Sequence, residues 1–411
     1  MCAFGGCTPT LNIVIIGPFA FQPKGTVSAR AFPIARALVR RGHRVTILMP
    51  PYDHLEDSGR AWEQAGVRLE NMPLRRNDSW HQLSVPMQMA RRATRLQPDV
   101  VHVFKPIGYG GLAGVYVRWF SRRPLVLDTD DWEGAGGWND VNPYPWLWKR
   151  LFDRQERWLA RHADSVTVAS QTLRAQVWGF GVDPARVVYL PNGPDPALWQ
   201  QAGVSEEQKA EIRARLGVGN APLALYLGHI PYGNDLDLAL DALAQLRDRL
   251  PEARLVIAGA GDGLPALQAQ AQVAGVADRV AFPGWIEHAQ APLYLASADA
   301  IVNPYRDTLI NRAKCAGKVV AAMAMGKAVV TSRVGQNLEY IEDGRSGLLT
   351  EPGDAAGLAQ ALLAVLSDRE WAEELGRNAR QRIWERFDWD ARVRDVERAY
   401  AIAIERRGRQ A

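Results

Sequence analysis

Two apolar segments of the same design, one in each half of the chain, limit what this sequence can fold into. They are LNIVIIGPF (Leu11–Phe19) and LALYLGHI (Leu223–Ile230), nearly unbroken apolar runs that reach a glycine. Such runs are typical of parallel strands that are buried on both faces of a sheet. After each of them the chain alternates helical segments with further short apolar runs. This order predicts a doubly wound α/β domain in each half.

The length of the chain agrees with two domains, because 411 residues are too many for one ordinary core. We predict a first domain over residues 1–200, a second over 201–385, and a C-terminal helix over 386–411 that packs back toward the first domain. Ligands of doubly wound folds bind outside the carboxyl ends of the strands. Two such domains facing each other across a cleft therefore suit an enzyme or a binding protein.

Composition excludes several classes of protein. No apolar run approaches the roughly 18 to 20 residues that span a bilayer, and MCAFGGCTPT at the start lacks the basic and apolar parts of a signal peptide. We therefore expect a cytoplasmic protein. The 3 cysteines form no C-x-x-C pair and no cluster with histidine, which argues against a disulfide framework or a zinc site.

Basic residues gather in the first half of the chain. Residues 1–200 carry 24 Lys and Arg against 17 Asp and Glu. This excess suits an anionic partner such as a phosphate or an acidic membrane surface. A solvated basic face that keeps the protein soluble explains it equally well. We expect no nucleic-acid partner.

Several motifs occur in a characteristic order along the chain. They are RALVRRGHRV, YLPNGPD, LVIAGAGDG, VAFPGWI and AMAMGKAVVTSRVGQNLEYIEDGRSGLLTEPGD. In this order and with these spacings, the chain resembles the retaining glycosyltransferases of family 4, which have the GT-B fold, over nearly its whole length. The resemblance implies that a sugar moves from a nucleotide-sugar, bound by the second domain, to an acceptor held mainly by the first. It implies retention of configuration and neither a metal ion nor a cofactor.

The departing diphosphate of such a reaction needs its negative charge stabilised, by cations or by a helix N-terminus. Gly317 precedes a helical segment, and a plain loop glycine is the alternative interpretation. The cations near it are Arg306, Arg312, Lys314 and Lys318. The resemblance adds further positions: Gly25 and His229 near the diphosphate, Gly259 and Gly261 beside the nucleotide, and Trp285 and Ile286 at the base. A buried packing role for Trp285 stays open.

Two residues of the first domain are candidates for catalysis. Asp130 falls where many family members have a histidine beside the sugar, and its carboxylate could bind a sugar hydroxyl or orient the acceptor. Asp128, Asp130 and Asp131 also form a D-x-D-D cluster, so a divalent metal site and helix capping are alternatives. His102 lies inside the apolar run VVHVF, where a core histidine is the competing interpretation.

The chain departs from the family pattern at the donor site. Two glutamates that contact the donor sugar and the ribose in relatives fall on Ala313 and Ala321, and a usual cation falls on His229. The segment NRAKC resembles a loop that replaces the first glutamate in a subgroup. Ala321 has no such explanation, and it should weaken donor binding roughly tenfold to a hundredfold. A noncatalytic GT-B binding protein, or a partner subunit of an active transferase, is therefore the alternative function.

The segment from Trp132 to Trp158 is the most aromatic in the sequence. It could line an acceptor cleft, stack on a sugar, or enter a membrane interface beside basic side chains. Ordinary helix packing is the alternative for Trp148, Phe152 and Trp158. We expect a saccharide or lipid-linked acceptor, and peripheral contact of the first domain with the inner membrane face is a further hypothesis.

Overall fold

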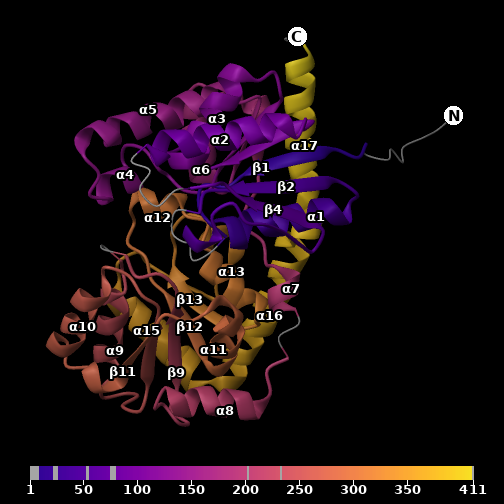
Figure 1. Ribbon diagram of the computed structural model, residues 1–411. Coiled ribbons are helices and arrows are strands. Elements are labelled where there is room, and N and C mark those ends of the chain that lie inside the picture. The colour runs from indigo at the N-terminus through magenta and orange to yellow at the C-terminus, as the bar shows by residue number, and fades with distance from the viewer. Residues whose placement is uncertain are drawn as a thin grey trace. The chain divides into compact units, whose positions relative to one another are not determined.

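A computed structural model describes residues 9–21, 26–51, 55–74, 80–200, 203–231 and 234–409 (Figure 1). The chain divides into two compact units. The first comprises the chain up to Pro191 together with Trp389 onward, and the second comprises Asn192–Asp388. Each unit is built on a largely parallel sheet with helices, so the prediction of two Rossmann-like α/β domains is confirmed. The first part of the first unit ends at Pro191, before the predicted boundary at residue 200, and α7 (Pro196–Trp199) belongs to the second unit.

The sheet of the first unit has the strand order β3-β4-β2-β1-β5-β6-β7-β8, in which only β3 runs antiparallel to its neighbour. Ile13 to Ile16 of β1 are completely buried, as the apolar run predicted. The strands of this sheet are β1 (Asn12–Ile16), β2 (Arg44–Met49), β3 (Ala61–Gln64), β4 (Val67–Asn71), β5 (Val100–Phe104), β6 (Leu125–Thr129), β7 (Ser165–Val168) and β8 (Val187–Tyr189).

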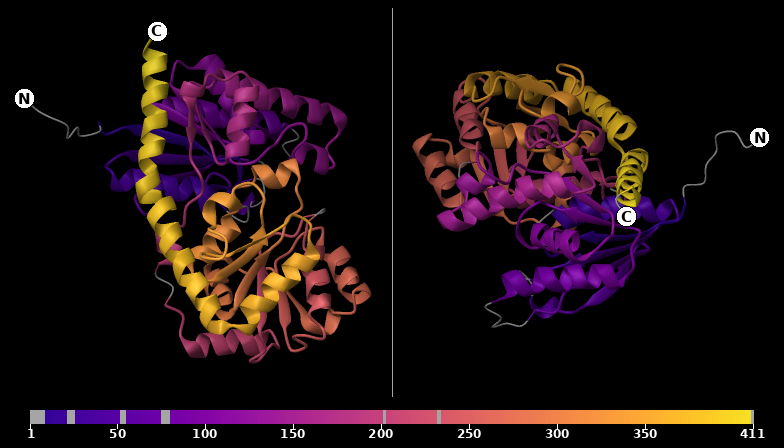
Figure 2. Two further views of the ribbon diagram at one scale, coloured as in Figure 1. Left: turned by 180° about the vertical axis from the view of Figure 1, so that it is seen from behind. Right: turned by 90° about the horizontal axis from the view of Figure 1, so that it is seen from above.

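Helices cover both faces of this sheet. The C-terminal helix α17 (Trp389–Gly408) contacts α1 (Phe32–Arg40), β7 and β8, and it is the long yellow helix of Figure 2. Its Trp389 and Tyr400 are completely buried in the same apolar cluster as β1. The remaining helices are α2 (His81–Arg95), α3 (Gly108–Phe120), α4 (Trp138–Val141), α5 (Trp146–His162) and α6 (Gln171–Gly179), and a π-helical turn, Thr26–Ala31, precedes α1.

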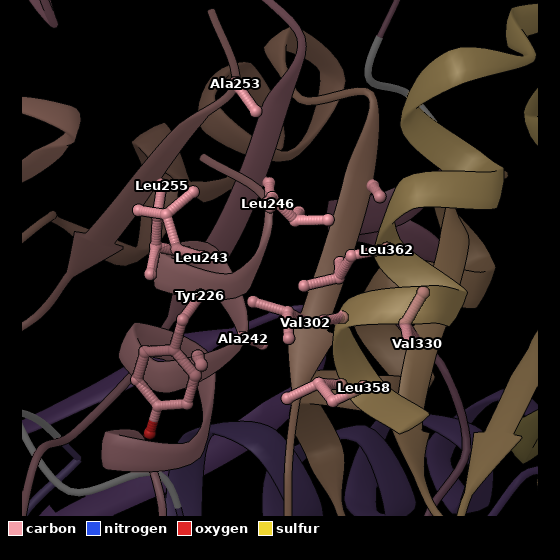
Figure 3. Close-up of a cluster of buried hydrophobic side chains, with 14 of the residues drawn as sticks. Tyr226, Ala242, Leu243, Leu246, Ala253, Leu255, Val302, Val330, Leu358 and Leu362 are labelled. Atoms are coloured by element: carbon pink, nitrogen blue, oxygen red, sulfur yellow. The ribbon is translucent and has the colours of Figure 1, made fainter. Parts of the chain in front are cut away.

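The second unit has a sheet of six parallel strands in the order β11-β10-β9-β12-β13-β14. Its core fills the space between the sheet and its helices, where Val302 of the sheet and Leu358 and Leu362 of α15 point toward one another (Figure 3). The strands are β9 (Leu223–Leu227), β10 (Arg254–Ala258), β11 (Val280–Gly284), β12 (Ala300–Asn303), β13 (Ala328–Ser332) and β14 (Leu348–Thr350). The helices are α8 (Glu206–Arg215), α9 (Asp237–Gln245), α10 (Leu264–Val273), α11 (Ala291–Ser297), α12 (Leu309–Ala313), α13 (Gly317–Ala324), α14 (Asn337–Tyr340), α15 (Ala355–Ser367) and α16 (Arg369–Phe387).

None of the helices in the described ranges is long and apolar enough to cross a membrane.

Candidate functional site

A buried ammonium group lies at the carboxyl edge of the first sheet, among three carboxylates. Lys105 follows β5, and Nζ lies 3.1 Å from Asp130 Oδ1, 2.8 Å from Asp131 Oδ2 and 2.5 Å from Glu133 Oε1. Because β5 and β6 are parallel neighbours, their ends meet at one edge and bring these groups together. Lys105 has a φ of 65°, a backbone conformation that is costly for a residue with a side chain. The fold maintains that conformation, and Lys105 as a whole is only 6% exposed.

The charges of this cluster depend on one another. Burial alone would lower the pKa of Lys105, but Asp130, Asp131 and Glu133 raise it well above its ordinary value. Burial raises the pKa of Asp130 to about 6, although Lys105 acts in the opposite direction. The Oδ1 atom of Asp130 is buried, and its contact with Lys105 lacks hydrogen-bond geometry, so this atom accepts no hydrogen bond from a described residue. Near neutral pH, Asp130 therefore keeps an acceptor oxygen that no described residue satisfies.

The D-x-D-D cluster does not act as one set of metal ligands. Asp128 is completely buried and pairs with Arg30, at 2.8 Å from each of two guanidinium nitrogens, and with Thr167 Oγ1 at 2.6 Å. Asp130, Asp131 and Glu133 have ligand atoms within 4.8 Å of one another, a grouping that could hold a cation. Lys105 already contacts all three, so a protein ammonium supplies one positive charge where a cation would sit.

A second buried carboxylate holds the loop that carries Glu133. Glu156 of α5 accepts hydrogen bonds from the backbone N–H of Glu133, at 3.1 Å, and of Gly134, at 2.9 Å. Burial raises the pKa of Glu156 to about 7, while the bond from Glu133 N–H works against that rise. The loop is thus fixed through its backbone by Glu156 and through a side chain by Lys105.

His102 lies in the core, not at the edge of the sheet. Its side chain is 0% exposed, with Nδ1 3.1 Å from the hydroxyl of Tyr400 and Nε2 3.5 Å from Thr167 Oγ1. Burial lowers the pKa of His102 to about 4, so the ring is neutral at physiological pH. This is the arrangement of a packed core histidine, the alternative that the sequence left open.

In the second unit, the N-terminus of α13 lies in the open. Gly317 is exposed, and a Cβ atom built on it would meet nothing within 4 Å. No side chain of the described residues caps this end of the helix, so its first N–H groups are available to a ligand. The side chain of Lys318 lies against Gly228 after β9, with Nζ 4.9 Å from the ring centre of Tyr226. Lys318 is the second residue of this helix, so its cation belongs to the same turn as these N–H groups.

Two further predicted cations, Arg312 and Lys314, also contact groups of the protein. Arg312 is exposed and forms an ion pair with Asp307 at 2.5 Å. Lys314 donates to Asn311 Oδ1 at 2.8 Å and lies over the ring of Tyr305. Of these three cations, Lys318 is the one that belongs to α13 itself.

Hydrogen bonds of Cys315 hold the chain in place just before α13 begins. Its Sγ lies 2.9 Å from the hydroxyl of Tyr340, and it accepts a hydrogen bond from the backbone N–H of Asn192 at 3.0 Å. The amide of Asn192 donates to the carbonyl of Cys315 at 2.9 Å. The motifs YLPNGPD and NRAKC thus meet at the start of this helix.

The predicted nucleotide-side residues lie on the loops after β9, β10 and β11. A Cβ on Gly259 would lie 1.8 Å from the carbonyl oxygen of Gly228, and one on Gly261 would lie 2.1 Å from that of Ile230. These glycines therefore let the two loops pack backbone to backbone. His229 is exposed, with Nδ1 2.9 Å from the carbonyl oxygen of Ala260.

Trp285 and Ile286 follow β11, and Trp285 is 54% exposed, so it is available for stacking and not buried by packing. Ala313 is completely buried, whereas Ala321 is half-buried on α13. Gly25 lies outside the described residues. The functional roles that the resemblance implies for these residues therefore remain predictions.

Sequence reasoning missed Lys105, Glu133 and Glu156 as a group. Each is an ordinary charged residue in its own segment, and only strand pairing brings the ends of β5 and β6 together. A lysine that directly follows a buried strand, beside a neighbouring strand that ends in acidic residues, was the available signal. Cys315 and Asn192 were likewise not recognised as partners, because they come from distant motifs.

Comparison with known proteins adds a family context to this geometry. Residues 221–368 match the family described as "Glycosyl transferases group 1", and residues 25–193 match the "Glycosyl transferase 4-like domain". The glycogen synthase of Mycobacterium tuberculosis is 33% identical over 350 residues, which cover 84% of this chain and 74% of that protein. A GDP-mannose-dependent alpha-(1-6)-phosphatidylinositol monomannoside mannosyltransferase of Mycolicibacterium smegmatis is 26% identical over 385 residues, or 90% of this chain and 93% of that one.

Solved structures show the same fold. Anabaena HepE in complex with UDP and glucose matches with a TM-score of 0.73 at 20% identity, over 94% of this chain and 98% of that chain. The catalytic domain of starch synthase IV from Arabidopsis thaliana, bound to ADP and acarbose, matches with a TM-score of 0.72 at 15% identity, over 97% and 100%. The predicted fold class therefore holds in both sequence and structure comparisons.

Proposed function

The chain belongs to the group 1 family of glycosyltransferases, which have the GT-B fold, and on this premise we propose that it transfers sugar with retention and without a metal ion or cofactor. It is an enzyme that uses a nucleotide-sugar donor. The alternative of a noncatalytic binding protein is not favoured, because the family and the named relatives are glycosyltransferases.

The observation that carries this proposal is the exposed N-terminus of α13, whose second residue is Lys318. N–H groups at a helix start and an ammonium together stabilise the charge that develops on a departing diphosphate. In the proposed step, the bond between C1 of the sugar and the diphosphate oxygen breaks while the acceptor oxygen bonds to C1 from the same face. The acceptor proton passes to the departing diphosphate oxygen.

Asp130 is our candidate for binding a hydroxyl of the sugar or acceptor. It offers a buried carboxylate oxygen that accepts no hydrogen bond from the described residues. A buried acceptor of this kind gains from a hydroxyl donor more than an exposed one does. Lys105 supplies the countercharge that a metal ion would otherwise supply to this acidic loop, which supports metal-independent chemistry.

We also propose a lipid-linked saccharide as the acceptor and peripheral contact of the first unit with a membrane. The support is the group of exposed apolar residues at the start of α5, where Trp146 is 68% and Leu147 63% exposed. The Mycolicibacterium relative, by its name, acts on a phosphatidylinositol monomannoside. The cytoplasmic location expected from the sequence stays a prediction, and sedimentation with anionic vesicles tests the membrane contact.

A screen of UDP, GDP, ADP and TDP and their sugars tests the function. We expect one nucleotide to raise the melting temperature of the full chain and its sugar conjugate to be hydrolysed slowly without acceptor. NMR of the first product formed should show the anomer of the donor, in EDTA as in buffer. The proposal fails if no nucleoside diphosphate binds and no nucleotide-sugar is cleaved.

A further inference from the structure

The first unit contains a cavity of about 900 Å³ between α2, α3 and α5. Its wall is mainly apolar, and the residues that matter here are Leu112, Tyr144, Trp148, Leu151, Phe152 and Trp158. The volume lies within the range of small-molecule sites, about 300 to 1,000 Å³. Figure 1 shows α2, α3 and α5 as neighbouring helices of this unit. We call this space the α3–α5 cavity.

The α3–α5 cavity opens onto an exposed apolar surface. Leu151 is 48% exposed and Trp148 36%, and Trp119 on the wall formed by α3 is 62% exposed. A soluble monomer seldom exposes a continuous apolar area of this kind unless something binds there. The partial exposure of these side chains shows that helix packing leaves much of their apolar surface uncovered.

Arginines from α5 stand on the same wall. Arg154, Arg157 and Arg161 all line the cavity. Arg157 forms a 3.3 Å ion pair with Asp153, and Arg161 donates to the carbonyl oxygen of Phe180. Arg154 is exposed, and no described residue pairs with it. An apolar space with guanidinium groups on its wall has the chemistry of a site for an amphiphile with an anionic head group.

The cavity also reaches the neighbourhood of the acidic loop. Gln155 lines it, and the next residue, Glu156, is the carboxylate that holds the backbone of Glu133 and Gly134. Tyr144 lines it too, and burial together with the charge of Glu133 raises the pKa of that phenol. Gln155 is 8% exposed, and its Nε2 has no hydrogen-bond partner among the described residues. A buried polar donor is therefore part of the cavity wall.

We propose that the α3–α5 cavity binds the hydrocarbon chain of a lipid-linked acceptor, with the lipid phosphate against Arg154 and Arg157. This inference rests on the proposed function and names the part of the acceptor that the first unit recognises. A cavity of this volume suits a single chain taken into the protein, whereas a flat apolar face would suit a bilayer surface. The arginines favour an anionic lipid over an apolar helix of a partner protein.

Titration calorimetry of the full chain with dodecyl phosphate, below its micelle concentration, tests this. We expect saturable binding of one molecule per chain, at least tenfold tighter than binding of dodecyl maltoside, which has the same chain and a neutral head. Inorganic phosphate should give no heat of binding. Binding of both dodecyl compounds with equal affinity would overturn the assignment of the phosphate to the arginines.

Matched variants locate the site. Leu151→Asp should weaken dodecyl phosphate binding at least tenfold, whereas Leu338→Asp, at an equally exposed leucine of the second unit, should not. Arg154→Gln should remove most of the preference over dodecyl maltoside, and Arg215→Gln, at an exposed arginine of α8, should leave it unchanged. Leu112→Trp, which fills the cavity without adding charge, should act like Leu151→Asp.

Nucleotide titration of the same protein separates this inference from the proposed function. If a nucleoside diphosphate binds but dodecyl phosphate does not, or the cavity variants bind as the wild type does, the cavity inference is wrong and the proposed function stands. If only vesicles bind, the surface is a bilayer contact and the cavity inference is again wrong. Binding of dodecyl phosphate without any nucleotide would leave the cavity assigned and overturn the proposed function.

Discussion

The ammonium of Lys105 lies 2.5 Å from Glu133 Oε1 and contacts two further carboxylates, all at the end of two neighbouring strands. A buried charge of this kind is stable only while its countercharges are present. Lys105 therefore links the folding of the acidic loop to the ionisation of Asp130.

Replacing the ammonium by an apolar group should destabilise the protein strongly. Lys105→Met leaves three carboxylates without their cation, and we expect the free energy of unfolding of the first unit to fall by about 3–5 kcal/mol. Urea denaturation measures this. Lys209→Met, at a lysine whose partner Glu206 is mostly exposed, should change it by less than about 1 kcal/mol. A loss at Lys105 no larger than that control would contradict the structural role of the cluster.

The plot of kcat/KM against pH should have an acidic limb that is due to Asp130. Its pKa is raised to about 6, and the ionised form is the hydrogen-bond acceptor, so kcat/KM should fall as the pH drops below about 6. Asp130→Asn should lower kcat/KM about tenfold to a hundredfold at pH 8 and abolish this limb. Asp131→Asn, which also removes a partner of Lys105, should keep an acidic limb. An unchanged limb in Asp130→Asn would exclude the role of this carboxylate.

Glu156 should make stability depend on pH in the opposite sense from an ordinary ion pair. Its folded pKa, about 7, lies above the model-compound value of 4.5, so the folded state binds the proton more tightly. The stability of the wild type relative to Glu156→Gln should therefore be greatest below about pH 4.5 and decline as the pH rises to about 7, by roughly 2 to 4 kcal/mol.

Urea unfolding from pH 4.5 to 8 measures the Glu156 effect. Glu211→Gln, at an exposed carboxylate of α8, should run parallel to the wild type at every pH. A constant difference between wild type and Glu156→Gln over this range would show that Glu156 does not titrate there.

The strands could be predicted from the sequence because apolar runs and glycines determine the local backbone structure. Leu11–Phe19 and Leu223–Ile230 each contain a central strand of a sheet, as their uninterrupted apolar character indicated. The alternation of strands and helices was enough to predict two Rossmann-like units. The start of α13 at Gly317 also followed from its local sequence.

The side-chain partners could not be predicted in the same way. Asp128, Asp130 and Asp131 are neighbours in the sequence, yet Asp128 pairs with Arg30 and the other two with Lys105. Which partner each carboxylate meets depends on strand register and on the turn after the strand, not on local pattern. The same holds for His102, whose partner Tyr400 comes from the far end of the chain.

The two alanines at the proposed donor site should respond differently to substitution by glutamate. Ala321 is half-buried on α13, so Ala321→Glu has room for a carboxylate and should tighten nucleoside diphosphate binding about tenfold to a hundredfold through the ribose. Ala313 is completely buried, so Ala313→Glu should instead destabilise the second unit. Calorimetry with the nucleotide found in the screen measures the affinity of each variant. An Ala321→Glu variant with unchanged affinity would contradict the ribose contact.

The most direct test of the donor site is the affinity of the full chain for its nucleoside diphosphate before and after Lys318→Met. We predict that this change weakens binding about tenfold to a hundredfold, because it removes one charged contact to the diphosphate. Arg215→Gln, outside the site, should bind as the wild type does. Equal affinity in Lys318→Met and wild type, or no binding of any nucleoside diphosphate to the wild type, would contradict a donor site at the start of α13.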